Sequence, residues 1–593
     1  MAVTSRAAAE ERKLVLGTDD LTGTEVTVVL GKKHPFVSWS SDEVLSFRKA
    51  LEDSTPASRG TRYGWNHRTN GPLVKAKQGD PIASGKLWLV NEDRSAAKRT
   101  CEYLLKKARA FNSKSFVELG CWKSPGELQK DAIAYDLVAG SGLFKTDEDA
   151  EVRSFLSASL RSLRKLSPYY GMHHNIGFWI DQGAWTAALC LQDEKALREL
   201  FDRFKEHIGR GLLPGGYWYE GTAYGNMVRG NLRAIIERAG RSGLNLATLN
   251  CRRIPLSKKW TVPDGFVRAG DIFEWQFRVV TPFGQIPNIG DGQAPRRFYG
   301  HGALTLSRYT RHPDFLNRYY TRDLTVNKIT DPHIWGYFPP NPKVPALKRM
   351  GDVAWSDPGI FIFRQGSGLG RDDQYVLFLA LPRSGYHPHS DQGHLSIARY
   401  GKWLTGDPES SARSTGYQKL RGAFSATRWA HNTIVVGGQW GKTEIGFSKV
   451  HYASPNDPDA KVQAADVTIE DFTKGTTATQ RRRVLVTDDF IVVTDDVNAA
   501  DETTFDWFFH GADNAPWSMD KALGPKSQPF LDYIPKHSEP DHNLTWSDSY
   551  ETSEPWKGAF LVDEKEQISL RVWQLDAEDG QFCSGVMRAP KHG

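Results

Sequence analysis

Hydrophobic positions recur at two different spacings in the two parts of this sequence. Between residues 93 and 242, apolar residues stand three and four positions apart, which is the spacing of one face of an α-helix. After residue 345 the pattern changes to short β-branched and aromatic runs separated by turn residues, which is typical of strands. The predicted helices cover 93–111, 126–143, 151–166, 178–191, 195–208 and 224–242, and the predicted strands cover 359–363, 375–381, 395–400, 433–436, 483–486, 490–494 and 568–573.

The two patterns meet at a proline-rich connection. The segment Phe338-Pro-Pro-Asn-Pro-Lys-Val-Pro345 continues neither helix nor strand. We therefore expect an α+β multidomain chain in which a helical domain over 41–345 precedes an antiparallel β-sandwich over 346–593. Residues 1–40 are expected to form an N-terminal extension.

Composition excludes several classes of protein. Hydrophobic residues make up 39% and charged residues 25% of the 593 residues, close to globular averages, which excludes a wholly disordered or coiled-coil chain. No apolar run reaches the roughly 20 residues of a membrane helix. The five cysteines are scattered without C-x-x-C spacing, which argues against a disulfide framework or a thiolate zinc site. The N-terminal residues 1–17 are charged, so no secretory signal is expected there.

Nucleotide and nucleic-acid binding are not expected. The glycine run Gly366-Ser-Gly-Leu-Gly370 lies between two predicted strands, whereas a phosphate-binding glycine loop opens a helix. Arg481-Arg-Arg483 leads into a strand and is interpreted as its solvated edge. The net charge of +6 is small for this length. We expect no nucleic-acid partner and no membrane partner.

Two polar segments in the helical part are candidates for chemistry. Gly171-Met-His-His-Asn-Ile-Gly-Phe-Trp179 places His174 and Asn175 at the start of a helix, where an amide or imidazole can donate hydrogen bonds to an anion. The alternative is that Asn175 is only an N-cap. A glycine-broken aromatic loop, residues 213–224, ends in Tyr224, which would need neighbours that stabilise a phenolate; packing is its alternative role.

Two further segments lie in the predicted sandwich. His389, Asp407 and His431 stand beside neighbouring strands and offer the nitrogen and oxygen ligands typical of zinc. A hydrogen-bonded cluster without metal is the alternative. His387, two residues away, would then face a substrate. His394 is interpreted as a core or surface residue.

These segments, in this order, resemble the heparinase II/III superfamily of polysaccharide lyases, which includes alginate lyases. The resemblance covers roughly residues 90–450. Its most specific part is the series His387-x-His389-x-Asp391, Leu395-Ser-Ile-Ala-Arg-Tyr-Gly401, Gly406-Asp-Pro408 and Ala430-His-Asn-Thr-Ile-Val-Val-Gly-Gly438. Asn288-Ile-Gly-Asp-Gly292 is similar to the family's Gly-Asp loop, although a plain turn explains it equally well.

The resemblance implies an (α/α) toroid, an incomplete barrel of helical hairpins, followed by the β-sandwich. It also implies β-elimination at a uronic acid residue, with Asn175 and His174 neutralising the carboxylate and Tyr224 acting as base, acid or both. His387 is the candidate for a histidine base, with His174 next. Trp179, Glu220 and Tyr417 are expected to contact the polysaccharide. His389, Asp407 and His431 match a structural zinc site, and no organic cofactor is implied.

Three functions therefore compete. The first is a polysaccharide lyase acting on an acidic polysaccharide or oligosaccharide, secreted or periplasmic as the resemblance implies, with cytoplasmic action on oligosaccharides as the alternative location. The second is a glycoside hydrolase, which needs two carboxylates about 5–10 Å apart; Glu220 and Asp181 are the acids near the proposed site. The third is a non-catalytic carbohydrate-binding relative.

Overall fold

The computed structural model places most of the chain. The residues it describes are 10–55, 72–166, 169–171, 173–256, 262–291, 296–297, 350–383, 387–407, 426–439, 441–442, 444–454, 460–511, 517–519, 545–551, 558–563, 568–573 and 583–588. The proline-rich connection at 338–345 and Tyr417 lie outside the described residues.

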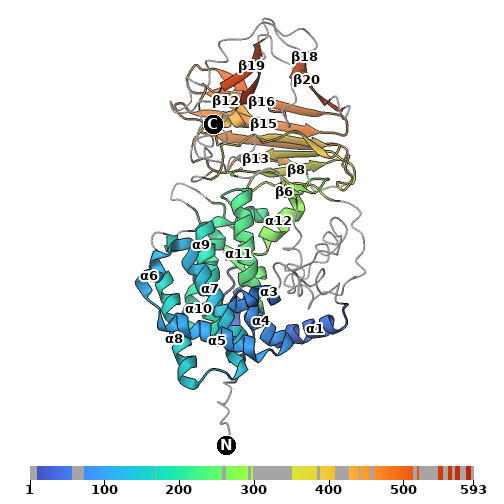
Figure 1. Cartoon of the computed structure of the whole chain (residues 1–593). Coiled ribbons are helices and arrows are strands. Elements are labelled where there is room, and N and C mark those ends of the chain that lie inside the picture. Colours follow the sequence, from blue (N-terminus) through green and yellow to red (C-terminus); the bar gives the residue numbers. More distant parts are fainter. Residues whose placement is uncertain are drawn as a thin grey trace, which may run out of the picture.

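The N-terminal part is helical (Figure 1). Within the described residues its helices are α1 (Ser41–Glu52), α3 (Pro72–Lys77), α4 (Pro81–Asn91), α5 (Arg94–Arg109), α6 (Ser113–Glu118), α7 (Gly120–Val138), α8 (Thr146–Leu163), α9 (Asn175–Leu191), α10 (Glu194–Gly211), α11 (Thr222–Arg241) and α12 (Asp271–Val279). The six helices that the apolar spacing predicts are confirmed as α5 and α7 to α11.

Helices α7 and α9 run side by side in the same direction. A Cβ on Gly183 of α9 would lie 2.6 Å from the carbonyl oxygen of Pro125 on α7, so glycine is needed for this approach. Further along both helices, Cys190 Sγ of α9 lies 3.4 Å from the carbonyl oxygen of Ala132 on α7. The N-terminal ends of both helices therefore lie at the same end of the domain.

Strands make up the C-terminal part, and short hairpins flank the helices. They are β1 (Arg12–Thr18), β2 (Glu25–Leu30), β3 (Asn250–Arg252), β4 (Phe266–Arg268), β5 (Gln285–Ile286), β6 (Arg296–Arg297), β7 (Val353–Trp355), β8 (Ile360–Arg364), β9 (Tyr375–Leu379), β10 (Leu395–Arg399), β11 (Lys402–Thr405), β12 (Ile434–Val436), β13 (Lys449–Ala453), β14 (Gln463–Glu470), β15 (Ala478–Val486), β16 (Ile491–Ala499), β17 (Phe505–Trp507), β18 (Trp517–Met519), β19 (Thr545–Glu551), β20 (Gly558–Asp563), β21 (Ile568–Trp573) and β22 (Cys583–Arg588). All seven predicted strand segments are confirmed.

Two antiparallel sheets form the centre of this β-domain. One has the strand order β11-β10-β9-β8-β7 and the other β13-β14-β15-β16. In β8, Ile360 and Ile362 join the hydrophobic core of the helical domain, whereas Phe361 and Phe363 join the core between the sheets. The strand is therefore buried on both faces, which explains its uninterrupted apolar sequence. The first sheet packs directly on the helices, which brings the loops of the β-domain to the end of the toroid.

The N-terminal residues belong to the helical domain's core. Strands β1 and β2 pair as an antiparallel hairpin, and their residues Leu14 and Val28 are buried in the same core as the helices. The backbone N–H of Val29 donates to the carbonyl oxygen of Ser242, just after α11. Residues 10–40 are thus packed into the domain that we expected to begin at residue 41.

Two smaller sequence expectations have clear outcomes. Residues 366–370 form the loop between β8 and β9, as predicted. The expectation of a solvated edge at Arg481–Arg483 is wrong for Arg482, which is 1% exposed and donates to the carbonyl oxygen of Asn432 at 2.8 Å. Alternate side chains of a strand point to opposite faces, so the middle arginine enters the sandwich. Among the described helices, none combines the length and apolar character needed to cross a bilayer.

Candidate active site

Helix α9 begins with its first residues turned toward the loop before α11. His174 is the N-cap: its Nδ1 accepts the backbone N–H of Ile176 at 3.0 Å. Asn175 is the first helical residue, so the alternative in which Asn175 caps the helix is wrong. The backbone N–H of Asn175 donates to Glu220 Oε2 at 2.8 Å, and its side-chain Nδ2 lies 3.8 Å from the sulfur of Met227.

The loop before α11 holds Glu220 in a buried position. Gly221 has a φ of +100°, and a Cβ there would lie 2.8 Å from the carbonyl oxygen of Ile289, so glycine is required. The indole Nε1 of Trp218 donates to Glu220 Oε2 at 2.8 Å. Burial raises the pKa of Glu220, although the hydrogen bonds from Trp218 and Asn175 oppose this. Glu220 therefore holds the start of α9, and its predicted contact with a polysaccharide stays a prediction.

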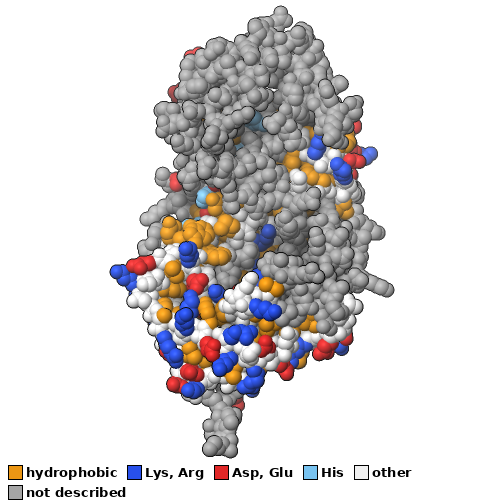
Figure 2. All heavy atoms as spheres, viewed as in Figure 1, with side chains coloured by type: hydrophobic (Ala, Val, Ile, Leu, Met, Phe, Trp, Pro, Cys, Tyr) orange, Lys and Arg blue, Asp and Glu red, His pale blue; other side chains and the backbone are white. Residues whose placement is uncertain are grey.

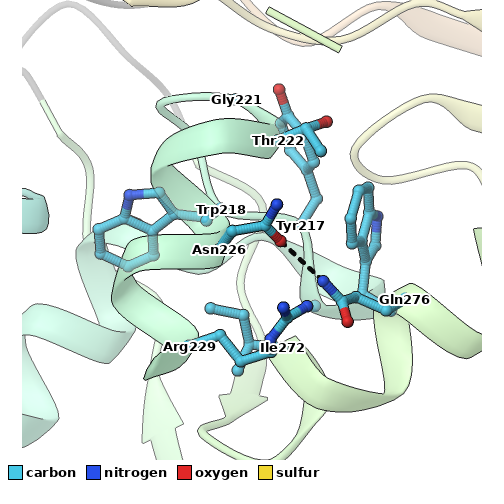
Figure 3. A pocket seen from close by; sticks show the side chains of 11 residues that line it. Tyr217, Trp218, Gly221, Thr222, Asn226, Arg229, Ile272 and Gln276 are labelled. Atoms are coloured by element: carbon cyan, nitrogen blue, oxygen red, sulfur yellow. Dashed lines mark hydrogen bonds between the residues drawn. The ribbon is translucent and has the colours of Figure 1, made fainter. Parts of the chain in front are cut away.

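A small cavity of about 10 Å³ lies beneath this loop (Figure 3). Tyr217, Trp218, Asn226 and Gln276 are among its lining residues, and Gln276 Nε2 donates to Asn226 Oδ1 at 2.7 Å. Small-molecule sites usually have about 300–1,000 Å³. This cavity is far smaller, so a substrate site is expected at the junction of the two domains instead.

Tyr224 and His387 meet at that junction. Tyr224 lies in the first turn of α11, and His387 lies in the β-domain loop between β9 and β10. Their ring centroids are 3.9 Å apart, and the ring planes are tilted by 36°. His387 Nε2 is 3.9 Å from Glu220 Oε1. The structure thus brings together Asn175, Glu220, Tyr224 and His387, all predicted from the sequence.

His174 borders the same group. Burial lowers the pKa of His174, and the charge of His387 contributes in the same direction. Because Nδ1 of His174 accepts a hydrogen bond, its neutral ring carries the proton on Nε2. His174 is therefore an uncharged hydrogen-bond donor at neutral pH.

Asp291 connects the site to the β-domain. Its Oδ2 is 2.7 Å from His387 Nδ1, and its Oδ1 is 2.9 Å from His389 Nε2. Asp291 belongs to the Gly-Asp segment 288–292 of the sequence, but an ordinary turn explained that segment equally well. Its role depends on a β-domain loop that is distant in sequence, so the local sequence does not indicate it.

The predicted metal ligands converge. The donor atoms of His389, Asp407 and His431 all lie within 4.8 Å of one another. Among the described residues, the Asp407 oxygens, the His431 nitrogens and His389 Nδ1 have no hydrogen-bond partner, although His431 Nδ1 lies 3.3 Å from Asp407 Oδ1. Burial raises the pKa of Asp407 to about 8 and lowers that of His431 well below its usual value. Buried polar atoms without hydrogen bonds are costly, and a divalent cation would satisfy them; the donor set fits zinc.

The Asp181 carboxylate is held in a buried network of ion pairs and hydrogen bonds. Arg203 donates to Asp181 Oδ1 at 2.7 Å, and His207 Nδ1 lies 2.8 Å from Asp181 Oδ2. Burial by itself raises the pKa of Asp181, but His207 and Arg203 outweigh it and hold the pKa below its usual value. A carboxylate stabilised in this way is a poor proton donor, which weakens the pairing of Asp181 with Glu220 that a hydrolase would need.

Two tryptophans lie at the same end of the helical domain. Trp179, one turn after Asn175 on α9, donates its indole N–H to the carbonyl oxygen of Trp122 on α7 at 2.8 Å. The two ring centroids are 6.5 Å apart, and Trp122 is 49% exposed. Figure 2 shows hydrophobic side chains gathered on the helical domain just below the β-domain. Sequence spacing did not separate Trp122 from the many core tryptophans.

Comparisons with known proteins agree with this architecture. Residues 352–582 match the family model "Heparinase II/III-like, C-terminal". Residues 352–582 therefore form a heparinase II/III-like C-terminal domain, and the resemblance read from the motifs is confirmed for this part of the chain. No curated protein sequence matches the chain.

Solved structures extend the likeness to nearly the whole chain. The heparan sulfate lyase HepC from Pedobacter heparinus is 13% identical with a TM-score of 0.54, covering 95% of this chain and 87% of that chain. A heparinase III gene product is 13% identical with a TM-score of 0.51, covering 93% of this chain and 85% of that one. At these identities the likeness establishes the fold, a helical toroid followed by an antiparallel β-sandwich.

Proposed function

We propose that this chain, which carries a heparinase II/III-like C-terminal domain, is a polysaccharide lyase that cleaves a uronic-acid-containing acidic polysaccharide by β-elimination. One observation carries the proposal: at the domain junction the His387 imidazole contacts the Tyr224 ring and lies 3.9 Å from the buried carboxylate of Glu220, which also accepts the backbone N–H of Asn175. These groups match the needs of an elimination next to a carboxylate.

The reaction has a demanding first step. A base removes the C5 proton of the uronate, which is α to a carboxylate whose negative charge resists deprotonation. The C5–H electron pair becomes the C4=C5 double bond, the C4–O bond breaks, and the leaving glycosidic oxygen takes a proton. Donors aimed at the uronate carboxylate lower this barrier most effectively.

Asn175 and His174 are suited to neutralise that carboxylate. The Asn175 Nδ2 group has a thioether sulfur at 3.8 Å as its partner, and sulfur is a weak acceptor. A uronate oxygen would be a better acceptor for the same N–H. His174 adds a neutral N–H donor at the same helix start without requiring a positive charge.

Tyr224 and His387 are suited to move the protons. Tyr224 would protonate the leaving oxygen. In a syn elimination Tyr224 is also the base, whereas the opposite C5 configuration would place His387 as the base. Because the two rings are in contact, one sugar at the junction would reach both.

Zinc would have a structural role. His389, Asp407 and His431 would hold the ion, and the bound ion would brace the loop that carries His387. The proton transfers proposed above use the chain's own side chains.

Trp179 and Trp122 are proposed to bind the polysaccharide beyond the cleaved bond. Aromatic faces pack against the apolar faces of sugar rings, and Trp122 exposes half its surface beside the helix that carries Asn175. The exposed Lys123 next to it would favour an anionic chain.

Cleavage in oxygen-18 water tests the proposal against its competitors. A panel of heparan sulfate, chondroitin, hyaluronan, alginate and glucuronan is incubated with the enzyme, and the fragments are weighed by mass spectrometry. Elimination adds no solvent oxygen, so products lacking the label are expected. A labelled oxygen at the new reducing end together with a saturated new non-reducing end would indicate a glycoside hydrolase, and binding without cleavage would indicate a carbohydrate-binding relative.

A further inference from the structure

Asp291 makes contacts with both functional histidines of the β-domain. Its side chain is 2% exposed and lies in the loop after β5, in the helical half of the chain. One carboxylate oxygen is 2.7 Å from His387 Nδ1 and the other is 2.9 Å from His389 Nε2. The backbone N–H of Asp291 also donates to the carbonyl oxygen of His387 at 3.1 Å.

The same residue is tied to the start of α11. The backbone N–H of Ala223 donates to the carbonyl oxygen of Asp291 at 3.2 Å, and Ala223 precedes Tyr224. Thr222 donates its backbone N–H to the carbonyl oxygen of Ile289 at 2.8 Å. The Asp291 loop is therefore fixed to the element that carries the phenol, so Asp291 sets the histidines relative to Tyr224.

A carboxylate accepts hydrogen bonds and does not donate them, which fixes the tautomer of each neutral ring. His387 must carry its proton on Nδ1, which leaves the Nε2 lone pair on the side of Glu220. His389 must carry its proton on Nε2, which leaves the Nδ1 lone pair toward Asp407 and His431. His389 Nδ1 makes no hydrogen bond with any described residue. One carboxylate thus prepares one ring for proton transfer and the other for a metal.

We propose that Asp291 is a positioning residue that couples the metal site to the catalytic histidine. Metal binding at His389 fixes that ring, the ring fixes the Asp291 carboxylate, and the carboxylate fixes His387 beside Tyr224. Outer carboxylates of this kind usually change metal affinity or activity about 10- to 100-fold when they are removed. The proposal rests on the proposed function for the role of His387, but its metal half is independent of any substrate.

The test compares full-length wild type with Asp291→Asn and Asp291→Ala. Asn keeps one acceptor oxygen and the volume of the side chain, whereas Ala removes both acceptors. Asp352→Asn is the matched control, because Asp352 is also a buried carboxylate that accepts the backbone N–H of Arg364 at 2.7 Å and bonds Gln463. Each protein is stripped of metal and titrated with Zn²⁺ against a chromophoric chelator.

Zinc affinity is expected to fall about 10- to 100-fold in both Asp291 variants and to stay within a few-fold of wild type in Asp352→Asn. On a cleaved polysaccharide, kcat of Asp291→Asn is expected to fall while KM stays nearly unchanged, because orientation and not binding is lost. Wild-type zinc affinity in a folded Asp291→Asn protein would overturn the proposal. If wild type cleaves nothing, the proposed function fails, yet the zinc titration still decides whether Asp291 supports the metal site.

Discussion

The phenol ring of Tyr224 lies against the imidazole of His387, with ring centroids 3.9 Å apart, although Tyr224 lies in the first turn of a toroid helix and His387 lies in a loop of the β-sandwich. Neither domain alone contains the pair. The packing of the first β-sheet on the helices therefore creates the site, and residues that hold this junction are expected to affect catalysis in addition to the reacting groups.

Asn175→Ala is expected to lower kcat about 10²- to 10³-fold, because the lost N–H donor faces charge that grows in the transition state. Thermal stability should change little, since the Asn175 contact with Glu220 uses the backbone N–H. Steady-state kinetics on the cleaved substrate check this. Asn226→Ala, which removes an amide bonded to Gln276, is the control and should keep most of kcat; an equal loss in both variants would contradict a specific role for Asn175.

Trp122→Ala is expected to raise KM about 2- to 12-fold with little change in kcat, the loss that one aromatic contact of about 0.5–1.5 kcal/mol produces. Folding should be unaffected because Trp122 is already half exposed. Trp507→Ala, at a tryptophan that is 40% exposed in the β-domain, provides the comparison. Identical KM values for Trp122→Ala and wild type would place the polysaccharide elsewhere.

Zinc is expected at one ion per chain, and its removal should lower the melting temperature. A ligand present at 1,000 times its Kd stabilises a fold by about 4 kcal/mol. Elemental analysis and thermal melts before and after chelation check both statements. His431→Ala should lose the ion, whereas His451→Ala, at an exposed histidine that bonds Thr468, should keep it. A metal-free wild type whose melting is insensitive to chelator and added zinc would contradict the site.

Asp181 is expected to make the helical domain acid-sensitive. Its pKa is lowered in the folded protein, so the stability it contributes is present above the unfolded pKa of about 3.9 and is lost as the pH falls toward the folded value. Asp181→Asn leaves Arg203 and His207 without their carboxylate and should cost about 3–5 kcal/mol at neutral pH.

The melting temperature of wild type and Asp181→Asn, measured from pH 3 to pH 7, checks this. The difference between the two proteins should be largest at pH 7 and shrink below about pH 4. A difference that is constant with pH would mean that the Asp181 charge is not responsible.

The fold was largely predictable because its elements carry strong local patterns. Helices α5 and α7 to α11 show amphipathic spacing, and strands β8 and β9 are apolar runs. In each case the pattern of buried positions lies within the helix or strand itself, so the local sequence reveals it. The sequence did not predict that the hairpin β1–β2 belongs to the core. The hairpin is short, and it is held by residues far along the chain such as Ser242.

The site residues that belong to sequence motifs were predictable. The residues whose role arises from packing between distant segments were not. His389, Asp407 and His431 were predicted as a group and converge in the structure. Asp291 looked like an ordinary turn residue, because nothing in a Gly-Asp sequence indicates which distant histidines will approach it. Trp122 likewise has no local sequence signal that separates an exposed tryptophan from a buried one.

The most direct test of the account is ultraviolet absorbance at the unsaturated-uronate band while the enzyme acts on the polysaccharide panel, with wild type, Tyr224→Phe and Tyr452→Phe compared. Tyr452 is 53% exposed on β13 and serves as the matched phenol. We predict that absorbance rises with wild type and Tyr452→Phe on at least one uronate polysaccharide and that Tyr224→Phe reduces the rate about 10²- to 10⁴-fold. An undiminished rise with Tyr224→Phe, or cleavage without any rise, would contradict the account.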